Sequence, residues 1–164
     1  MLFWVFDLDN TLYQLPRNTE FHYKYLDNDY QLKYSLSLLP MKKILYTNGT
    51  IGHADMCLKI LDIENYFYKR ICREDMNYIM KPHIKSFMIF IKKNKIMKND
   101  KVVFFEDSVE NLITAKNSFG WITVLIHPNH IMIPEIDFWF PNIHIALNFF
   151  NSKIMNHMKN IKKL

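Results

Sequence analysis

The chain alternates short, unbroken apolar runs with longer stretches in which apolar residues recur every three or four positions. Unbroken runs of aromatic and branched residues, too short for a helix, are typical of strands buried on both faces of a parallel sheet. This pattern predicts strands at residues 2–6, 43–46, 101–105 and 121–126, a weaker strand around 68–72 and a short one at 137–140.

Helical spacing fills the intervals between these runs. Ile51, Ala54, Leu58 and Leu61 are separated by three or four positions, which places them on one face of a helix. Proline suits the first turn of a helix, serine its N-cap and glycine its end. These signals predict helices within residues 20–38, after residue 50, from Lys81-Pro82, from Ser108 to Gly120, and from residue 143 onward.

Strands that alternate with helices predict a parallel, doubly wound sheet. We therefore expect an α/β fold, a three-layer Rossmann-like sandwich, in a single domain spanning residues 1–164. A parallel crossover alone uses a dozen or more residues. The predicted crossovers fill the intervals 10–42 and 50–80, so we expect no substantial cap domain.

Composition excludes several other classes of protein. A hydrophobic content of 49% with 15% aromatic residues argues against disorder, and the longest apolar runs are far shorter than a membrane span. Asp7 and Asp9 interrupt the first apolar run, so this run does not fit a secretory signal. Two cysteines without metal-site spacing suit a reducing environment, and we expect a cytoplasmic protein.

The formal net charge of +5 is modest. Lysines cluster within residues 92–101 and 153–163, and the last predicted helix therefore has a basic face. Such clusters are usually solvated faces, and nucleic-acid binding is the alternative. Charge alone does not identify a partner, and we expect no membrane association.

Polar residues directly follow three of the predicted strands, at the carboxyl ends where open α/β sheets bind ligands. A single D-x-D pair has an ordinary alternative, a polar strand end that caps the next turn. The coincidence after three strands favours an active site instead. The residues are Asp7 and Asp9, then Thr47 and Asn48, then Glu106 and Asp107.

This cluster suits the hydrolysis of a phosphate monoester, which needs a nucleophile, charge neutralisation and a proton for the leaving group. Asp7 can attack phosphorus to form an aspartyl-phosphate, and Asp9 can act as general acid and base. Asp7 and Asp107 offer the oxygen ligands that suit Mg²⁺. Thr47 and the amides after it offer neutral donors to the phosphoryl oxygens. Lys81 offers a cation, although an exposed lysine is its ordinary interpretation.

In these motifs the sequence resembles the haloacid dehalogenase (HAD) superfamily, over about residues 3–126. The motifs appear in order as Asp7-Leu8-Asp9-Asn10-Thr11, Thr47-Asn48-Gly49, Lys81-Pro82, and Glu106-Asp107-Ser108 with Asn111. The chain is most similar to the pyrimidine 5′-nucleotidase branch, in the segments FDLDNTLY, TNGTIGHADMCLKILDIENYF, KPHIKSF and FFEDSVENLITAKNSFGW.

The resemblance implies a HAD-like fold and a Mg²⁺-dependent phosphatase with Asp7 as nucleophile and Asp9 as general acid and base. The second carboxylate argues against a dehalogenase, because members that cleave carbon–halogen bonds lack it. The implied metal ligands are Asp7, Asp9 through its carbonyl, and Asp107. The implied phosphate-binding residues are Thr47, Asn48, Gly49 and Lys81, with Thr11, Glu106, Ser108 and Asn111 in supporting positions.

The sequence departs from the family in two ways. Glu106 stands where relatives usually carry aspartate, while Asp107 keeps the expected position of the metal ligand. The nucleotidases also carry a helical cap domain between the first two motifs, for which this chain has no room. In this superfamily caps enclose small substrates, whereas members without caps often act on phosphates of macromolecules.

These observations leave several hypotheses open. The first is a phosphomonoesterase for small substrates, nucleoside monophosphates foremost. The second is a phosphatase without a cap that acts on polynucleotide ends or a phosphoprotein, and the third is a non-catalytic binding module. The aromatic residues Phe138, Trp139, Phe149 and Phe150 suggest surplus apolar surface, from which we expect a homodimer.

Overall fold

The computed structural model describes residues 1–15 and 20–161. The chain alternates strands and helices along almost its whole length. The strands are β1(Leu2–Phe6), β2(Lys42–Tyr46), β3(Lys69–Ile71), β4(Lys101–Glu106), β5(Ile122–Ile126) and β6(Phe138–Phe140). The α-helices are α1(Tyr30–Leu38), α2(Ile51–Ile60), α3(Ile84–Asn94), α4(Val109–Phe119) and α5(Ile143–Ile161), and the 3-10 helices are η1(Tyr23–Tyr25), η2(Glu64–Tyr66) and η3(Arg73–Met76).

The strands form one parallel sheet in the order β3-β2-β1-β4-β5-β6. The chain starts in the middle of the sheet and winds outward in both directions, and strand order reverses at β1. Val5 of β1 lies between Ile44 of β2 and Phe104 of β4. The predicted α/β, three-layer Rossmann-like fold is confirmed. The carboxyl ends of β1, β2 and β4 are adjacent, at the place where open α/β sheets bind ligands.

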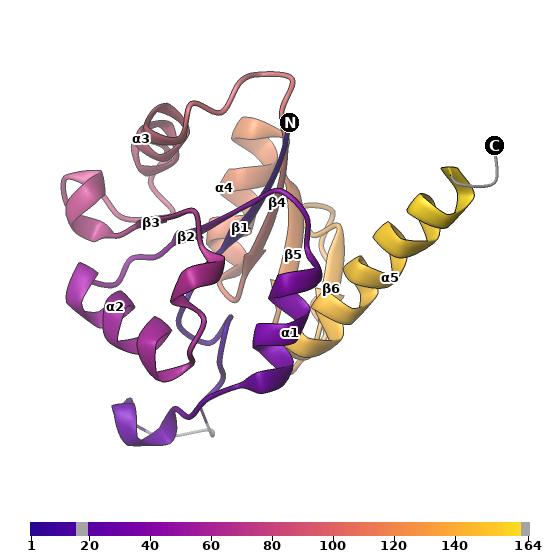
Figure 1. The fold of residues 1–164 in the computed structure, drawn as a ribbon. Coiled ribbons are helices and arrows are strands. Elements are labelled where there is room, and N and C mark those ends of the chain that lie inside the picture. Colours follow the sequence, from indigo (N-terminus) through magenta and orange to yellow (C-terminus); the bar gives the residue numbers. More distant parts are fainter. Residues whose placement is uncertain (16–19, 162–164) are drawn as a thin grey trace.

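Helices cover both faces of the sheet (Figure 1). On one face, α1, α2 and α5 pack on the side chains of Trp4, Phe6 and Leu45. On the other, α3 and α4 pack on Phe3 and Val5. Because side chains alternate along a strand, β1 contributes to both cores, which explains its unbroken apolar sequence.

Aromatic rings fill much of both cores. On the α1 side, the rings of Phe6 and Phe105 stack with centroids 4.6 Å apart. On the α3 side, Tyr46 stacks on Phe90 at 4.3 Å. The first contact joins β1 to β4, and the second joins β2 to α3.

Most predicted elements are confirmed, but the start of the third α-helix is wrong. Lys81-Pro82 does not open α3, which begins at Ile84 after an N-cap at His83. The side chain of Asn48 accepts from the backbone N–H of Lys81 and donates to the backbone carbonyl of Lys81. These two hydrogen bonds hold residue 81 in a loop rather than in the first helical turn.

Other helix ends agree with the sequence signals only in part. Ser108 is the N-cap residue of α4, but its side chain makes no capping hydrogen bond. Gly120 ends α4 in the left-handed conformation, with φ of 65°. Within residues 20–38, the α-helix covers only the last part. It begins directly after Asp29, whose side chain caps its N-terminus.

The crossover from β1 to β2 is short. Among the residues that the structure describes, it holds only η1 and α1, with no cap domain. In the part of the chain that is described, no helix has both the length and the apolar character needed to cross a bilayer.

Candidate active site

Asp7 is the first residue beyond β1. Its N–H donates to the carbonyl of Phe105 at 2.9 Å, which continues the pairing of β1 with β4. The residue is 7% exposed, and the hydroxyl of Thr11 lies 3.5 Å from its Oδ2. The neighbouring Leu8 is fully buried and accepts the N–H of Leu12, so the chain turns directly after the strand. Asp7 therefore sits at a fixed place on the rim of the sheet.

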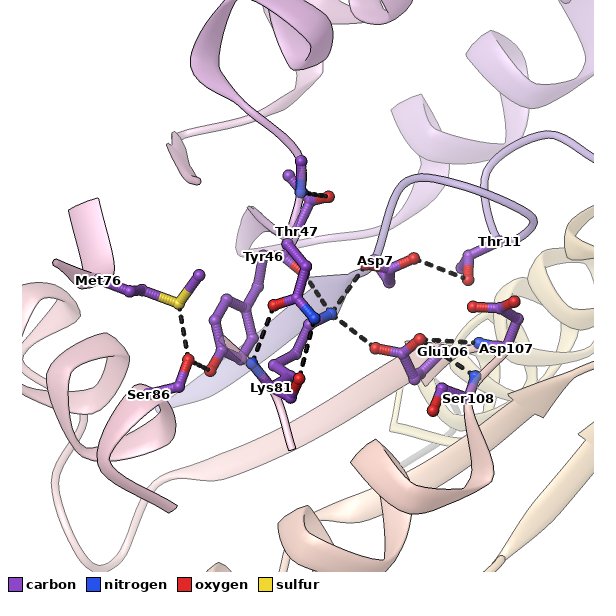
Figure 2. A network of polar contacts seen from close by, with 12 residues as sticks. Asp7, Thr11, Tyr46, Thr47, Met76, Lys81, Ser86, Glu106, Asp107 and Ser108 are labelled. Carbon is purple, nitrogen blue, oxygen red and sulfur yellow. Dashed lines mark hydrogen bonds and ion pairs between the residues drawn. The ribbon is translucent and has the colours of Figure 1, made fainter. Parts of the chain in front are cut away.

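Lys81 reaches this rim from the loop before α3, and its side chain is completely buried. Its Nζ donates to Asp7 Oδ1 at 2.8 Å, to Glu106 Oε2 at 2.6 Å and to the carbonyl of Tyr46 at 2.8 Å. An ammonium group has three N–H bonds, and each one finds an acceptor here. Figure 2 shows the two carboxylates converging on this ammonium group. Lys81 is thus a buried ionic link between β1, β2 and β4, rather than an exposed lysine.

The residues after β2 support Lys81. Asn48 accepts from the Lys81 N–H at 2.9 Å and donates to the Lys81 carbonyl at 3.0 Å. Thr47 is buried, and its Oγ1 accepts from the N–H of Gly49 at 2.9 Å. Among the described residues, no acceptor takes the hydroxyl proton of Thr47, so it is available to a ligand, whereas the Asn48 side chain is engaged with the backbone of residue 81.

The end of β4 supplies two more carboxylates. Glu106 binds Lys81 through Oε2, and its Oε1 accepts from the N–H groups of Asp107 and Ser108 at 3.1 and 3.2 Å. Asp107 is half-buried beside it. Asn111 is buried in the first turn of α4. Glu106, predicted as a supporting residue, therefore anchors the lysine and the start of the β4–α4 loop.

Burial and crowding raise the proton affinity of these carboxylates. Burial, followed by the charge of Glu106, raises the pKa of Asp7 to about 7, despite the ammonium of Lys81. Burial also raises the pKa of Glu106 and of Asp107 above their ordinary values. Burial alone would lower the pKa of Lys81, but Asp7 and Glu106 outweigh it and raise the pKa, so the lysine is charged.

The donor set fits a hard divalent cation. Asp7, Glu106 and Asp107 each offer a carboxylate oxygen, and these oxygens lie within 4.8 Å of one another. Three carboxylates face a single ammonium, so positive charge placed between them would relieve their repulsion. Both oxygens of Glu106 accept hydrogen bonds of 3.2 Å or less, whereas Asp7 Oδ2 has only the 3.5 Å contact with Thr11, so Asp7 and Asp107 are better placed as ligands. Oxygen-only donors suit Mg²⁺.

Asp9 lies apart from this buried network, with a side chain that is 41% exposed. Its Oδ1 accepts from the hydroxyl of Tyr13 and lies 2.7 Å from Nε2 of His53. No role for these two partners follows from the sequence analysis. The only sequence signal for His53 was its place in the segment TNGTIGHADMC, because no local spacing links residue 53 to residue 9.

A sequence profile described as haloacid dehalogenase-like hydrolase matches residues 34–120. The matched interval contains the site residues contributed by β2, the loop before α3, and β4. The chain belongs to the haloacid dehalogenase-like hydrolase family. Asp7 and Asp9 precede the matched interval and join it in space through Lys81 and His53.

Solved structures show the same fold. L-2-haloacid dehalogenase from Xanthobacter autotrophicus is 16% identical, with a TM-score of 0.63 over 78% of this chain and 62% of its own. A HAD phosphatase from Thermococcus onnurineus is 23% identical, with a TM-score of 0.59 over 74% and 57%. YfnB from Bacillus subtilis, in a structure bound to magnesium, is 16% identical, with a TM-score of 0.58 over 72% and 54%. The chain thus spans less than two thirds of the length of these hydrolase structures.

Proposed function

We propose that the protein is a Mg²⁺-dependent phosphomonoesterase that acts through an aspartyl-phosphate on Asp7. The observation that carries this proposal is the buried link from Lys81 to Asp7 and Glu106, with Asp107 beside it. Among the solved structures with this fold, one is a HAD phosphatase and another is bound to magnesium. Mg²⁺ held by Asp7, Asp107 and the Asp9 carbonyl would supply positive charge to the phosphoryl group.

The chain's own residues then divide the reaction into two displacements. A carboxylate oxygen of Asp7 attacks phosphorus, and the bond from phosphorus to the ester oxygen breaks as Asp9 gives that oxygen a proton. In the second displacement, water attacks the aspartyl-phosphate and gives its proton to Asp9, which releases inorganic phosphate and restores Asp7. Thr47 donates to a phosphoryl oxygen, while Lys81 holds Asp7 in place.

Nucleoside monophosphates are the proposed substrates. The support is the sequence similarity to the pyrimidine 5′-nucleotidase branch in the segments that flank the site. Haloacid dehalogenases share the fold, but Asp9 provides the proton-transfer group that an ester oxygen requires as a leaving group and a halide does not.

A macromolecular phosphate is the second candidate. It is supported by the crossover between β1 and β2, which holds no cap domain among the described residues and leaves Asp9 41% exposed. Tyr78 and Met80, on the loop that leads to Lys81, are 69% and 46% exposed and offer contact surface for a large substrate. A binding module without catalysis is a weaker candidate, because the nucleophile, the proton donor and the cation are all present.

A phosphatase screen with Mg²⁺ tests these candidates. We expect release of phosphate from UMP or CMP well above that from 4-nitrophenyl phosphate, and a loss of at least about a thousandfold in kcat for Asp7→Asn. Preference for phosphorylated oligonucleotides or phosphopeptides over mononucleotides would favour the second candidate. Activity equal to that of Asp7→Asn on every ester would exclude a phosphatase.

A further inference from the structure

Asp9 stands on the turn after β1, where a partly exposed carboxylate would ordinarily sample several rotamers. Here one of its oxygens has two hydrogen-bond partners. The hydroxyl of Tyr13 donates to Oδ1, and Nε2 of His53 lies 2.7 Å from the same atom. Two partners on one oxygen, from the turn itself and from α2, leave the carboxylate little rotational freedom.

Both partners are themselves fixed. Burial, and then the hydrogen bond to Asp9, raise the pKa of Tyr13 far above its ordinary value, so its hydroxyl keeps its proton and donates. His53 stands in the first turn of α2, where its N–H donates to the side chain of the N-cap residue Thr50 at 3.1 Å. The backbone of His53 is therefore set by the helix that follows β2.

The crossover segment fixes the ring of His53. The hydroxyl of Tyr23 lies 3.0 Å from Nδ1 of His53, and the ring of Phe21 meets the imidazole edge to face, with centroids 4.9 Å apart. One tautomer satisfies both contacts: Nε2–H donates to Asp9, and Nδ1 accepts from Tyr23. The hydrogen bonds then run in one direction, from Tyr23 through His53 to Asp9.

The second oxygen of Asp9 faces the phosphate-binding side of the site. A Cβ placed on Gly49 would lie 3.2 Å from Thr47 Oγ1 and 3.8 Å from Asp9 Oδ2, so these oxygens flank the same point. Among the described residues, none donates a hydrogen bond to Oδ2. Oδ2 is therefore the oxygen left available to a ligand beside Thr47.

We propose that His53 and Tyr13 are positioning residues that fix Asp9 through Oδ1, so that Oδ2 exchanges the proton with the ester oxygen of the substrate. Tyr23 and Phe21 extend this support to the crossover segment, which thereby contributes to catalysis without covering the site. The inference rests on the proposed role of Asp9 as general acid and base.

Leaving-group dependence distinguishes positioning from a purely structural role. A misplaced general acid slows the departure of an alkoxide, but it hardly affects 4-nitrophenolate, which leaves without a proton. We therefore expect His53→Ala to lower kcat/KM for a primary-alcohol ester such as UMP by about 10- to 100-fold, because a misplaced general acid loses only part of a contribution that is typically about 100- to 10,000-fold. The loss of kcat/KM on 4-nitrophenyl phosphate should be less than about threefold, because kcat/KM reports only the first displacement, in which this leaving group needs no proton.

His53→Gln keeps an N–H donor near the position of Nε2 and should recover most of the loss. Tyr13→Phe removes the other donor to Oδ1 and should give the same selective loss by a separate route. Met56→Ala, on an exposed position of α2, is the matched control and should behave as the wild type. Circular dichroism and thermal unfolding would verify that each variant is folded.

The outcomes separate the two proposals. If Asp9→Asn shows the selective loss but folded Tyr13→Phe matches the wild type and folded His53→Ala loses activity on both substrates equally, positioning is wrong and the phosphatase stands. If wild-type turnover does not depend on Asp7, the proposed function fails and the positioning role fails with it. Selective loss in His53→Ala with recovery in His53→Gln supports both.

Discussion

Lys81 brings an ammonium group into a place where its side chain has no contact with solvent. Burying such a charge costs several kcal/mol, and three acceptors offset that cost here. The sequence reveals the lysine but not its burial, because an isolated lysine is ordinarily exposed. Burial follows only from three strand ends that meet after folding, and no local spacing encodes it.

Removing the ammonium should leave Asp7 and Glu106 crowded without a partner. We expect Lys81→Met to lower the free energy of unfolding by about 3 kcal/mol, as is typical when one member of a buried ion pair is lost. Urea unfolding in the presence of a chelator measures this. Lys59→Met, on an exposed position of α2, is the matched control and should change the free energy by less than about 0.5 kcal/mol. Equal stability of the two variants would contradict the buried link.

At the same scale, the residues that follow β1, β2 and β4 were predictable because parallel strands end at one edge. Glu106, Asp107 and Asp7 do lie together. The partners of Asp9 were not predictable. Tyr13 reaches it across a turn and His53 from a separate helix, and both contacts depend on side-chain directions that the linear sequence does not reveal.

At the scale of elements, hydrophobic patterning was enough to predict each strand and the order of the helices. It could not predict where α3 begins, because Asn48 holds residue 81 from a distant strand end. Nor could it predict how Asp137 joins β5 to β6. The side chain of Asp137 accepts from the Thr123 N–H at 2.9 Å and from Lys116 Nζ at 2.6 Å.

The contribution of the Asp137 side chain to stability should depend on pH. Burial would raise its pKa, but Lys116 and Thr123 outweigh burial and hold the pKa below its ordinary value. A depressed folded-state pKa stabilises the protein above the unfolded pKa of about 3.9, and the contribution is lost as pH falls through the folded value. Asp137→Asn should therefore cost about 1 kcal/mol near neutral pH, and less below pH of about 4. Chemical unfolding across pH measures the difference, and a cost independent of pH would contradict it.

Replacing either of two glycines by alanine tests the backbone conformation, because the two changes in stability should have opposite signs. Gly120 has φ of 65°, and no atom lies within 4 Å of a Cβ built there, so Gly120→Ala should cost about 1 kcal/mol through strain alone. Gly52, in the first turn of α2, has the same open surroundings and no positive φ. Gly52→Ala should therefore stabilise by about 0.5 kcal/mol. Thermal unfolding of both variants checks the signs, and the same sign for both would contradict the assigned conformations.

At the scale of the whole molecule, the fold places the site where the two halves of the sheet diverge from β1. The expected homodimer stays a prediction, but the aromatic residues from which we inferred surplus apolar surface are no longer its best support. Phe138 and Phe150 pack against the core, and Phe149 contacts both of them. Exposed apolar side chains lie instead on α1, where Tyr30, Tyr34 and Leu38 are 75%, 65% and 41% exposed.

Metal binding should stabilise the molecule as a whole, because the carboxylates that gather at the site are dispersed in the unfolded chain. Asp7 and Asp107 come from β1 and β4, so a ligand between them favours only the folded sheet. At a Mg²⁺ concentration one hundred times its Kd, we expect the free energy of unfolding to rise by about 2.7 kcal/mol. Thermal unfolding with increasing Mg²⁺ measures this, and a chelator should reverse it.

Asp107→Asn removes a proposed ligand while keeping its volume, and it should abolish most of this stabilisation. In the absence of metal, Asp107→Asn should be at least as stable as the wild type, because it removes one of three carboxylates that repel one another. Burial already raises the pKa of Asp107, which shows that its charged form is disfavoured there. Asp55→Asn, on the exposed face of α2, is the matched control and should keep the full response to Mg²⁺. If Mg²⁺ stabilised Asp107→Asn as much as the wild type, the cation would bind elsewhere, and the assignment of Asp7 and Asp107 as its ligands would be wrong.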